Sequence, residues 1–444
     1  MKTELTSYRK IWDIGWPIAI SLYAESIVSV TDTAFLGRVG EVALGGSAIG
    51  GLFYVLLLMV GHGFTTGVQI LIARRYGEKN DHAIGVIFDN GLYFISLISL
   101  FFIFLIFFTG KYFLSLIVAS PEIMVAADTY LSYRIFGLLF TASILLFRSL
   151  FTGIHYTRYL SIASIIMASV NIFLDYAMIF GNFGFPEWGI KGAAIATAIA
   201  EGCGMLFLLI VIMTTKPFKP YKLFKWVKPQ WEIIKSTLNV SSFVMLQFLL
   251  TMGVWFAFFI IIEKMGEREL AISNIGRSVY MFLMIPAWAL GSVTNTLVSN
   301  ALGEKKPEKV LPLTFKIIRL SAVILLCVIL PAAVFPGVVL GLFTNDASLI
   351  TAAIPTYYTI LVALFFFSLI FILFNAVLGT GNTKITLLIE VVTLTFYMFY
   401  TWFIAIHLKQ PLHIVWTAEL VYATFMGSLS YLYLKKGNWR EIKI

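Results

Sequence analysis

Four acidic residues interrupt long apolar stretches in the first half of the chain. Glu25 and Asp32 lie seven residues apart within residues 12–36, which is about two helical turns and places both on one face. Asp175 and Glu201 lie in two later apolar stretches. An acid near the centre of a membrane-spanning helix costs roughly 2.5 to 3.5 kcal/mol on insertion scales. Because this cost is usually tolerated for a function, these acids are candidates for binding a proton or a cation.

Two neutral polar residues accompany these acids. Asn171 lies one turn before Asp175 and Thr197 one turn before Glu201, in each case on the same helix face. At 1.5 Å per residue, Asp32, Asp175 and Thr197 share a layer about 6 to 10 Å below the predicted outer boundary. Two carboxylates, an amide oxygen and a hydroxyl suit a proton or a small alkali cation. Taken alone, Asn171 and Thr197 are more simply interpreted as hydrogen-bonding neighbouring helices together.

The helix that carries the first two acids also contains Pro17. Proline removes a backbone hydrogen-bond donor, so the helix is expected to kink at this point. A bendable helix with acids on one face is typical of a moving element that handles ions.

The composition indicates the elements that must position these residues. Of 444 residues, 59% are hydrophobic and only 12% are charged, which excludes an ordinary soluble domain. Cys203 and Cys327 lie in apolar stretches and predict neither a structural disulfide nor a zinc site. We predict an all-α membrane protein with twelve transmembrane helices, near residues 12–36, 48–72, 87–108, 130–151, 159–180, 190–213, 237–262, 273–299, 315–335, 353–378, 386–407 and 413–434.

Basic residues are distributed unevenly between the two sets of predicted loops. The set that includes both termini carries 24 Lys and Arg residues, Arg148 among them, and the other set carries 6. By the positive-inside rule, both termini are predicted to be cytoplasmic, in a protein of the cytoplasmic (inner) membrane. The net charge of +9 is thus interpreted as orienting the chain in a lipid bilayer, and no nucleic-acid partner is expected.

The two halves of the chain align without a gap when Gly40 is placed on Gly266. Under this shift, the segment 77–79 falls on 303–305, and Gly153 falls on Gly379. We therefore predict two six-helix lobes related by a pseudo-twofold axis along the membrane normal, residues 1–213 and 237–444. A basic cytoplasmic linker, residues 214–236, joins them. Such duplicated halves are typical of alternating-access transporters.

The second half lacks counterparts of the polar set. The same shift places Phe258, Tyr397 and Thr401 opposite Asp32, Asn171 and Asp175. Glu390 and Glu419 lie near predicted helix ends, where an acid can reach water, and are interpreted as structural or gating residues. Candidates for an adaptable substrate cavity are Glu25 and Glu201 together with Met252, Trp255, Met281, Met284 and Trp288. Packing or lipid contact is an equally good interpretation of each of these Met and Trp residues.

Sequence motifs of enzymes and of ATP-driven pumps are missing. The chain contains no Walker A sequence, no G-x-S-x-G and no H-E-x-x-H. We therefore expect that the protein is not an enzyme and needs no cofactor beyond a coupling ion.

In these features the chain resembles the multidrug and toxic compound extrusion (MATE) family, specifically its DinF-like branch. The resemblance spans nearly the whole chain and is carried by an ordered set of local matches. They are Trp16-Pro17, Asp32-Thr33-Ala34, Leu36-Gly37, Leu44-Gly45-Gly46, Gly77, Lys79-Asn80, Asn171, Asp175 and the stretch from Gly192 to Thr197. The other well-known branch has an acid on helix 7 and another on helix 10, whereas residues 237–262 and 353–378 contain none.

The resemblance implies a role for five of these residues. Pro17 would form the kink of the first helix, and Asp32, Asn171, Asp175 and Thr197 would form the cation site, which is a metal site only if sodium is the coupling ion. We expect a secondary active transporter that exports small organic, amphipathic or cationic compounds by proton or sodium antiport, working as a monomer. The alternative is a flippase for a lipid-linked oligosaccharide, for which a basic cavity would be expected. No Lys or Arg cluster is visible in the first half, but Arg277 leaves this alternative open.

Overall fold

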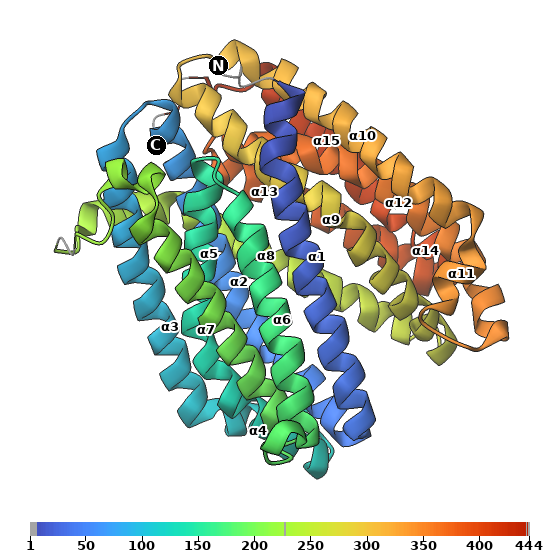
Figure 1. Cartoon of the computed structure of the whole chain (residues 1–444). Helices are drawn as coiled ribbons and strands as arrows, with labels where there is room; N and C mark the ends of the chain where they lie inside the picture. The colour runs from blue at the N-terminus through green and yellow to red at the C-terminus, as the bar shows by residue number, and fades with distance from the viewer. Residues whose placement is uncertain (1–6, 226–227, 441, 443–444) are drawn as a thin grey trace. The chain divides into compact units, whose positions relative to one another are not determined.

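The computed structural model describes residues 7–225, 228–440 and 442, and the regular elements of these residues are helices (Figure 1). Within the described residues, eleven helical stretches are long and apolar enough to cross a membrane. They are α1 (Tyr8–Val39), α2 (Glu41–Gly77), α3 (Asp81–Ile117), α4 (Pro121–Arg134) continued by α5 (Leu138–Gly153), α6 (Arg158–Phe180), α7 (Ile190–Thr214), α8 (Trp231–Glu263), α9 (Glu267–Gly303), α10 (Val310–Val334), α12 (Ala347–Gly379) and α13 (Thr383–Trp402), continued to His407.

The twelfth predicted span, residues 413–434, is a broken helix. It consists of α14 (Leu412–Val415) and α15 (Ala418–Lys436), separated by a turn. A further short helix, α11 (Pro336–Gly341), follows α10. The predicted all-α class is therefore confirmed, and most helices extend several residues beyond their predicted ends.

The chain divides into two compact units. The N-terminal unit comprises residues 20–245, and the C-terminal unit comprises residues 1–19 with 246–444. Helices α1 and α8 each contribute residues to both units. These limits differ from the predicted lobe boundaries at residues 1–19 and 237–245, which belong to the opposite unit.

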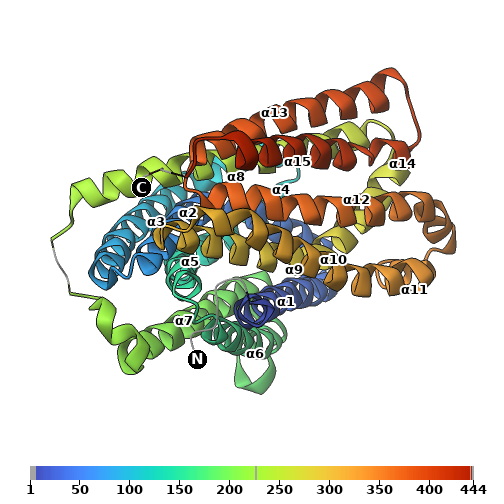
Figure 2. The same cartoon turned by 90° about the horizontal axis from the view of Figure 1, so that it is seen from above.

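In the N-terminal unit, α2 packs against α3, α4 and α5, and α6 lies beside α7 (Figure 2). The first part of α8 also packs on α2, where two glycines allow close approach. A Cβ atom added at Gly63 or Gly67 would collide with the backbone of Met245 or Ser241. The Ser241 hydroxyl donates to the Phe64 carbonyl oxygen over 3.0 Å. In a lipid bilayer the hydrophobic effect does not drive helices together, so small residues at such a contact stabilise it by allowing close van der Waals packing.

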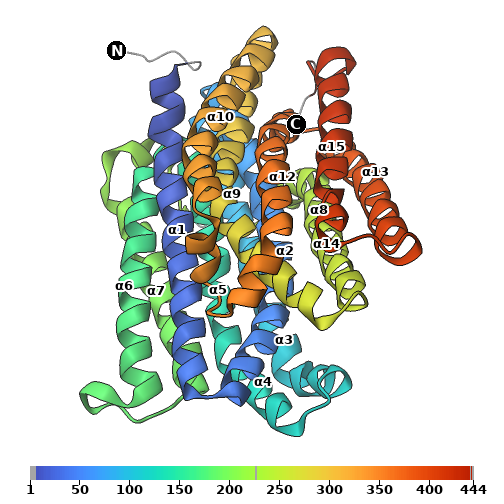
Figure 3. The same cartoon turned by 90° about the vertical axis from the view of Figure 1, so that its right-hand side faces the viewer.

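In the C-terminal unit, α12 packs against α9, α10 and α15, and α13 packs against α15 (Figure 3). The largest fully buried side chains of this unit are aromatic, among them Phe258, Tyr357, Tyr397 and Trp416. The Phe258 ring lies 5.7 Å from that of Tyr397 and 5.2 Å from that of Trp416. These aromatic residues occupy the region that the repeat relates to the polar set of the first half.

The predicted internal repeat is visible in the backbone. Under the shift that places Gly40 on Gly266, both ends of α2 fall on the ends of α9. Gly40 and Gly266 precede these helices with φ of 146° and 150°, a conformation that side chains other than glycine rarely adopt. Lys79 and Lys305, after the ends of these helices, both have φ of 58°.

The repeat also extends to packing. Gly153, the last residue of α5, lies against Ile72 of α2. Gly379, the last residue of α12, lies against Val298 of α9, and the same shift relates both residues of this contact to those of the first. Two six-helix halves related by duplication are therefore confirmed.

One buried acid of the N-terminal unit binds the linker. Asp89 lies in the third turn of α3 and is 7% exposed. Its carboxylate accepts the backbone N–H groups of Phe224 (2.9 Å) and Lys225 (3.2 Å). The neighbouring Asn90 accepts the N–H of Gln230 at 2.7 Å. These two side chains therefore anchor the linker on α3.

Candidate functional site

A cavity of about 650 Å³ lies within the N-terminal unit. Its walls come from α1, α2, α4, α5, α6 and α7, and most of the lining is apolar. The polar and charged side chains on the wall include Glu25, Asp32, Tyr54, His62, Arg134, Arg148, Asn171, Thr197 and Glu201. These residues come from six helices, so the cavity exists only when the helices of this unit are assembled.

The four residues predicted for the cation site lie together in this unit. Asp32 of α1 is on the cavity wall and interacts with the side chains of Asp175, Asn171 and Thr197. Asp175 of α6 is 0% exposed and does not line the cavity. The Asp32 side chain therefore lies between the cavity and the carboxyl group of Asp175.

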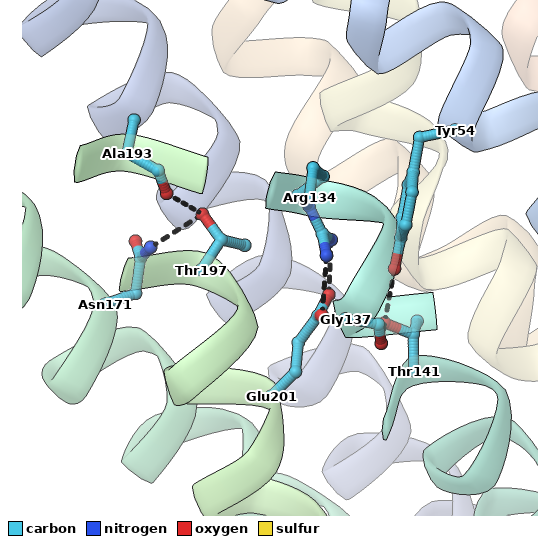
Figure 4. A network of polar contacts seen from close by, with 8 residues as sticks. All are labelled: Tyr54, Arg134, Gly137, Thr141, Asn171, Ala193, Thr197 and Glu201. Carbon is cyan, nitrogen blue, oxygen red and sulfur yellow. Dashed lines mark hydrogen bonds and ion pairs between the residues drawn. The ribbon is translucent and has the colours of Figure 1, made fainter. Parts of the chain in front are cut away.

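The neutral side chains of this site hydrogen-bond to each other and to the backbone of α7 (Figure 4). The Asn171 amide donates to the Thr197 hydroxyl over 3.3 Å, and that hydroxyl donates to the Ala193 carbonyl oxygen over 2.9 Å. With its amide nitrogen directed at Thr197, Asn171 keeps its oxygen for another partner. That oxygen, one oxygen of Asp32 and both oxygens of Asp175 are buried without a hydrogen-bond donor among the described residues. Buried acceptors that lack a donor are costly, so the site favours a proton or a cation.

A buried ion pair lies on the cavity wall next to this site. The Arg134 guanidinium of α4 donates to both oxygens of Glu201 of α7, over 2.7 and 2.5 Å (Figure 4). The guanidinium also lies 3.8 Å above the centre of the Tyr54 ring, and the Tyr54 hydroxyl shares a hydrogen bond of 2.7 Å with Thr141. Glu201, which was expected to line a substrate cavity, does lie on the cavity wall, and Arg134 compensates its charge. The role of Arg134 was not predicted, although a basic residue inside a predicted span was the available signal.

A second ion pair joins α1 and α5. The Arg148 guanidinium donates to the Glu25 carboxylate, and the Ser21 hydroxyl lies between this pair and Ser164 of α6, 2.5 Å from the Ser164 hydroxyl. The assignment of Arg148 to a cytoplasmic loop was wrong, because it is a half-buried residue of α5. The positive-inside count keeps its sign without this residue.

These pairings separate the four acids into two groups. Glu25 and Glu201 each have an arginine as partner. Asp32 and Asp175 have no ion pair among the described residues, although Arg134 is near enough to Asp32 to interact with it electrostatically. Two adjacent carboxyl groups without a counter-charge cannot both be ionised cheaply in a medium of low dielectric constant.

A model of the MatE family matches residues 17–177 and again residues 244–403, which is more than half of the chain. The chain belongs to the MatE family. Under the shift that places Gly40 on Gly266, the two matched ranges nearly coincide, in agreement with the internal repeat. As a member of this family of transporters, the protein is a multi-pass membrane transporter.

Proteins similar to this MatE chain include multidrug-resistance proteins. A Thermotoga maritima protein named "Probable multidrug resistance protein NorM" is 27% identical over 99% of this chain and 95% of its own length. A Listeria innocua protein of the same name is 26% identical over 77% of this chain and 75% of its own.

Solved structures show the same fold. One is an outward-facing multidrug resistance MATE family transporter of the MOP superfamily, with a TM-score of 0.90 and 18% identity over 97% of this chain and 96% of that one. Another is a crystal structure of a MATE protein in complex with MaL6, with a TM-score of 0.89 and 18% identity over the same shares.

The Met and Trp residues proposed for the substrate cavity belong to the C-terminal unit of this MatE chain. Met284 is fully buried in the core of that unit, and Trp255 and Trp288 pack against the same core. Met252 is half-buried, and Met281 is 43% exposed. None of the five lines the cavity of the N-terminal unit.

The expectation that Glu390 and Glu419 reach water is wrong. Glu390 is 1% exposed and Glu419 is 3% exposed. Glu390 lies two turns into α13 and is covered by Thr251 of α8 and Tyr422 of α15. Glu419 lies at the start of α15 and is covered by Tyr397. The sequence places an acid near a helix end but does not show which other helices cover that end.

Proposed function

We propose that this protein exports small organic compounds by antiport with protons or sodium ions, through alternating access. The observation that carries this proposal is the Asp32–Asp175 pair, a half-buried acid on the wall of a cavity large enough for a small molecule and a fully buried acid beside it. Neither has an ion-pair partner among the described residues. In a membrane, such acids mark ion pathways and coupling sites. Asn171 and Thr197 supply neutral oxygens to the same site.

The pair couples ion binding to movement through its charge. When a proton or sodium ion neutralises the two carboxyl groups, α1 can approach α6 and α7, because the repulsion between Asp32 and Asp175 is removed. Pro17 interrupts the hydrogen-bond ladder of α1 and gives the helix a place to bend. Closing the cavity in this way would drive the substrate out toward the external side.

The cavity supports an amphipathic or cationic substrate. Its lining is mostly apolar, and the two ion pairs cancel their own charges. Asp32 thus provides the uncompensated negative charge of the wall, with Asp175 behind it. The names of the relatives as multidrug-resistance proteins agree with a range of such substrates.

A lipid-linked oligosaccharide flippase is less well supported. Such a protein needs free cationic groups for a pyrophosphate. Arg134 and Arg148 do face the cavity, contrary to the expectation of no basic residues there, but Glu201 and Glu25 occupy them. Arg277 lies over the Phe259 ring in the C-terminal unit, 5.3 Å from its centre.

We further propose that the chain is of the DinF-like branch and acts as a monomer in the cytoplasmic membrane with both termini in the cytoplasm. The absence of acids from residues 237–262 and 353–378 supports the branch, and the positive-inside rule supports the orientation. Residues 1–6 and 443–444 lie outside the described part of the chain.

An efflux assay in cells that lack their own exporters tests the function. Cells that produce the protein are loaded with a panel of fluorescent cationic, neutral and anionic compounds, and loss of each compound is followed with time. We expect faster loss of cationic amphipathic compounds, and no acceleration with Asp32→Asn at equal protein level. Transport of anionic compounds alone, unaffected by Asp32→Asn, would overturn the proposal.

A further inference from the structure

Glu390 in the C-terminal unit is a buried acid that the proposed transport site does not use. One of its oxygens accepts the hydroxyl groups of Thr251 from α8 over 2.7 Å and of Tyr422 from α15 over 2.6 Å. Its other oxygen, Oε2, is buried and has no hydrogen-bond partner among the described residues. The side chain therefore joins three helices through one oxygen and leaves the other free for a ligand.

Two further buried oxygens without partners in the described part of the chain lie on the same helices. Gln247 Oε1 is on α8, one turn before Thr251, and Thr393 Oγ1 is on α13, almost one turn after Glu390. Gln247 is 6% exposed and Thr393 is 0% exposed. Unsatisfied buried acceptors are rare in folded proteins. A hydrogen carried by Glu390 Oε2 would provide the kind of donor that these neighbours lack.

Positive charge does not compensate Glu390. In the described part of the chain no Lys or Arg pairs with it or interacts with it electrostatically. Helix α12, which packs against α13, carries no charged residue at all. Among the described residues, the titratable group that interacts with Glu390 is Tyr422 of α15. Tyr422 in turn interacts with Glu419 of α15 and Tyr280 of α9, and its ring packs against that of Tyr397 of α13.

The internal repeat shows how this arrangement differs from the first half. The shift that places Gly40 on Gly266 relates Ser21, Glu25 and Ser164 to Gln247, Thr251 and Glu390. In the N-terminal unit these three residues form the hydrogen-bonded group that Arg148 holds. In the C-terminal unit the acid has moved from the first helix of the repeat to the fifth, and Phe374 replaces the arginine. The same location has thus changed from an ion pair to an acid without a counter-charge.

From this geometry we propose that Glu390 is a second proton-binding site, in the C-terminal unit, which takes up and releases a proton during transport. Proton uptake removes an uncompensated charge from the unit, and proton release restores a carboxylate that Thr251 and Tyr422 stabilise as donors. A proton fits better than an alkali ion, because a cation needs several oxygen ligands and Glu390 Oε1 already accepts two hydroxyl groups.

Glu419 provides a matched control because it is as buried as Glu390 and also lacks a positive partner among the described residues, but has a different set of donors. It lies in the first turn of α15, where the helix dipole favours a negative charge. It also accepts the Tyr397 hydroxyl over 3.1 Å and interacts with the hydroxyl of Tyr280. Glu390, in the interior of α13, has no such help from a helix end. The two acids are equally buried but differ in what stabilises their charge.

Infrared difference spectroscopy of the purified full-length protein in lipid nanodiscs tests the proposal directly. The spectrum at alkaline pH is subtracted from that at acidic pH, and the C=O band of protonated carboxyl groups is measured. We expect Glu390→Gln to remove one band and Glu419→Gln to leave that band unchanged. Tyr422→Phe should keep the band but raise its frequency, since a C=O group that loses a hydrogen bond stiffens. A variant is compared only if it elutes as a single folded species in size-exclusion chromatography.

Two results would overturn the proposal. In one, the folded Glu390→Gln variant has the same difference spectrum as the unaltered protein. In the other, the band of Glu390 responds to sodium at constant pH and not to pH, which would make it an alkali-cation site. The inference rests on the proposed antiport for its role in transport, but the spectroscopic result does not. Loss of the band with efflux driven by neither a proton gradient nor a sodium gradient would keep the site and refute the antiport, whereas gradient-driven efflux with an unchanged band would do the opposite.

Discussion

The acids of the N-terminal cavity differ in one property, which is whether an arginine compensates them. Glu201 and Glu25 lie in ion pairs with Arg134 and Arg148. Asp32 lies beside Asp175, and neither has a donor for all of its buried oxygens among the described residues. Removing an acid from the first group should therefore affect stability, and removing one from the second group should affect transport.

Substitution of the unpaired acids should abolish export without loss of folded protein. Asp32→Asn and Asp175→Asn keep the size of the side chain and remove the proton- or cation-binding carboxyl group. An amide in the membrane interior costs less than an ionised acid, so insertion and folding should not suffer. Efflux per molecule of folded protein, quantified by in-gel fluorescence of a fusion, measures the effect. Asp346→Asn, which keeps the N-cap of α12 at an exposed site, is the control and should transport normally.

Substitution of the paired acids should lower stability to different extents. Glu201→Gln leaves the buried Arg134 without its counter-charge, and breaking a buried pair typically costs about 3 to 5 kcal/mol. Glu25→Gln should cost less, because the Glu25 side chain is 39% exposed and water can solvate Arg148. Thermal unfolding in detergent compares the two variants. Equal losses of stability would contradict the difference in burial from which this expectation is derived.

At this scale the sequence predicted the acids but not their partners. Asp32, Asn171, Asp175 and Thr197 could be grouped because helical periodicity and depth are readable from spacing. The Arg134–Glu201 pair connects residues 67 positions apart, and its formation depends on how α4 faces α7. No periodicity within a single helix contains that information.

Among the elements, the helices were predictable because their signal is local. A long apolar stretch bounded by turn residues predicts a span whatever surrounds it. The environment of Glu390 and Asp89 was not predictable in this way. Glu390 is covered by Thr251 of α8 and Tyr422 of α15, and Asp89 by the linker at Phe224, and each of these partners belongs to an element distant in the sequence.

The attachment of the linker to α3 can be tested by proteolysis. Asp89→Ala removes the acceptor of two backbone N–H groups, and hydrogen bonds to a charged group contribute about 1.5 to 3 kcal/mol each. Trypsin should therefore cleave after Lys222 or Lys225 at least about tenfold faster, if cleavage requires local opening. Glu232→Ala, at an exposed position of α8, should leave the rate unchanged. An unchanged rate in Asp89→Ala would show that other contacts hold the linker.

For the whole molecule, the orientation in the membrane follows from the basic residues. Lys222 lies in the linker, and Lys111 lies exposed near the end of α3. A cysteine placed at Lys111 should react with a membrane-impermeant maleimide in intact cells, and one placed at Lys222 should react only after lysis. The background needs Cys203→Ser and Cys327→Ser, because Cys327 is exposed. The reverse labelling pattern would contradict the proposed orientation and the depth of the cation site.

Duplication gave the two halves the same helices, but their polar residues have diverged. Gly40 and Gly266, or Gly153 and Gly379, keep the backbone and packing that the fold requires. Asp32 corresponds to Phe258, which lies against the rings of Tyr397 and Trp416, and Asp175 corresponds to Thr401. The half with the unpaired aspartates should therefore dominate the response to an imposed ion gradient.

Transport driven by ion gradients in proteoliposomes tests this last expectation. Because Asp32 and Asp175 offer the same oxygens to a proton and to sodium, each ion should weaken the effect of the other. An imposed pH gradient or sodium gradient, directed inward from the external face, should drive substrate outward, and a constant high concentration of the other ion should reduce the initial rate. Asp32→Asn should abolish the response to both gradients, and Asp346→Asn should preserve it. If neither gradient drives the unaltered protein but a membrane-impermeant nucleotide does, the antiport proposal fails.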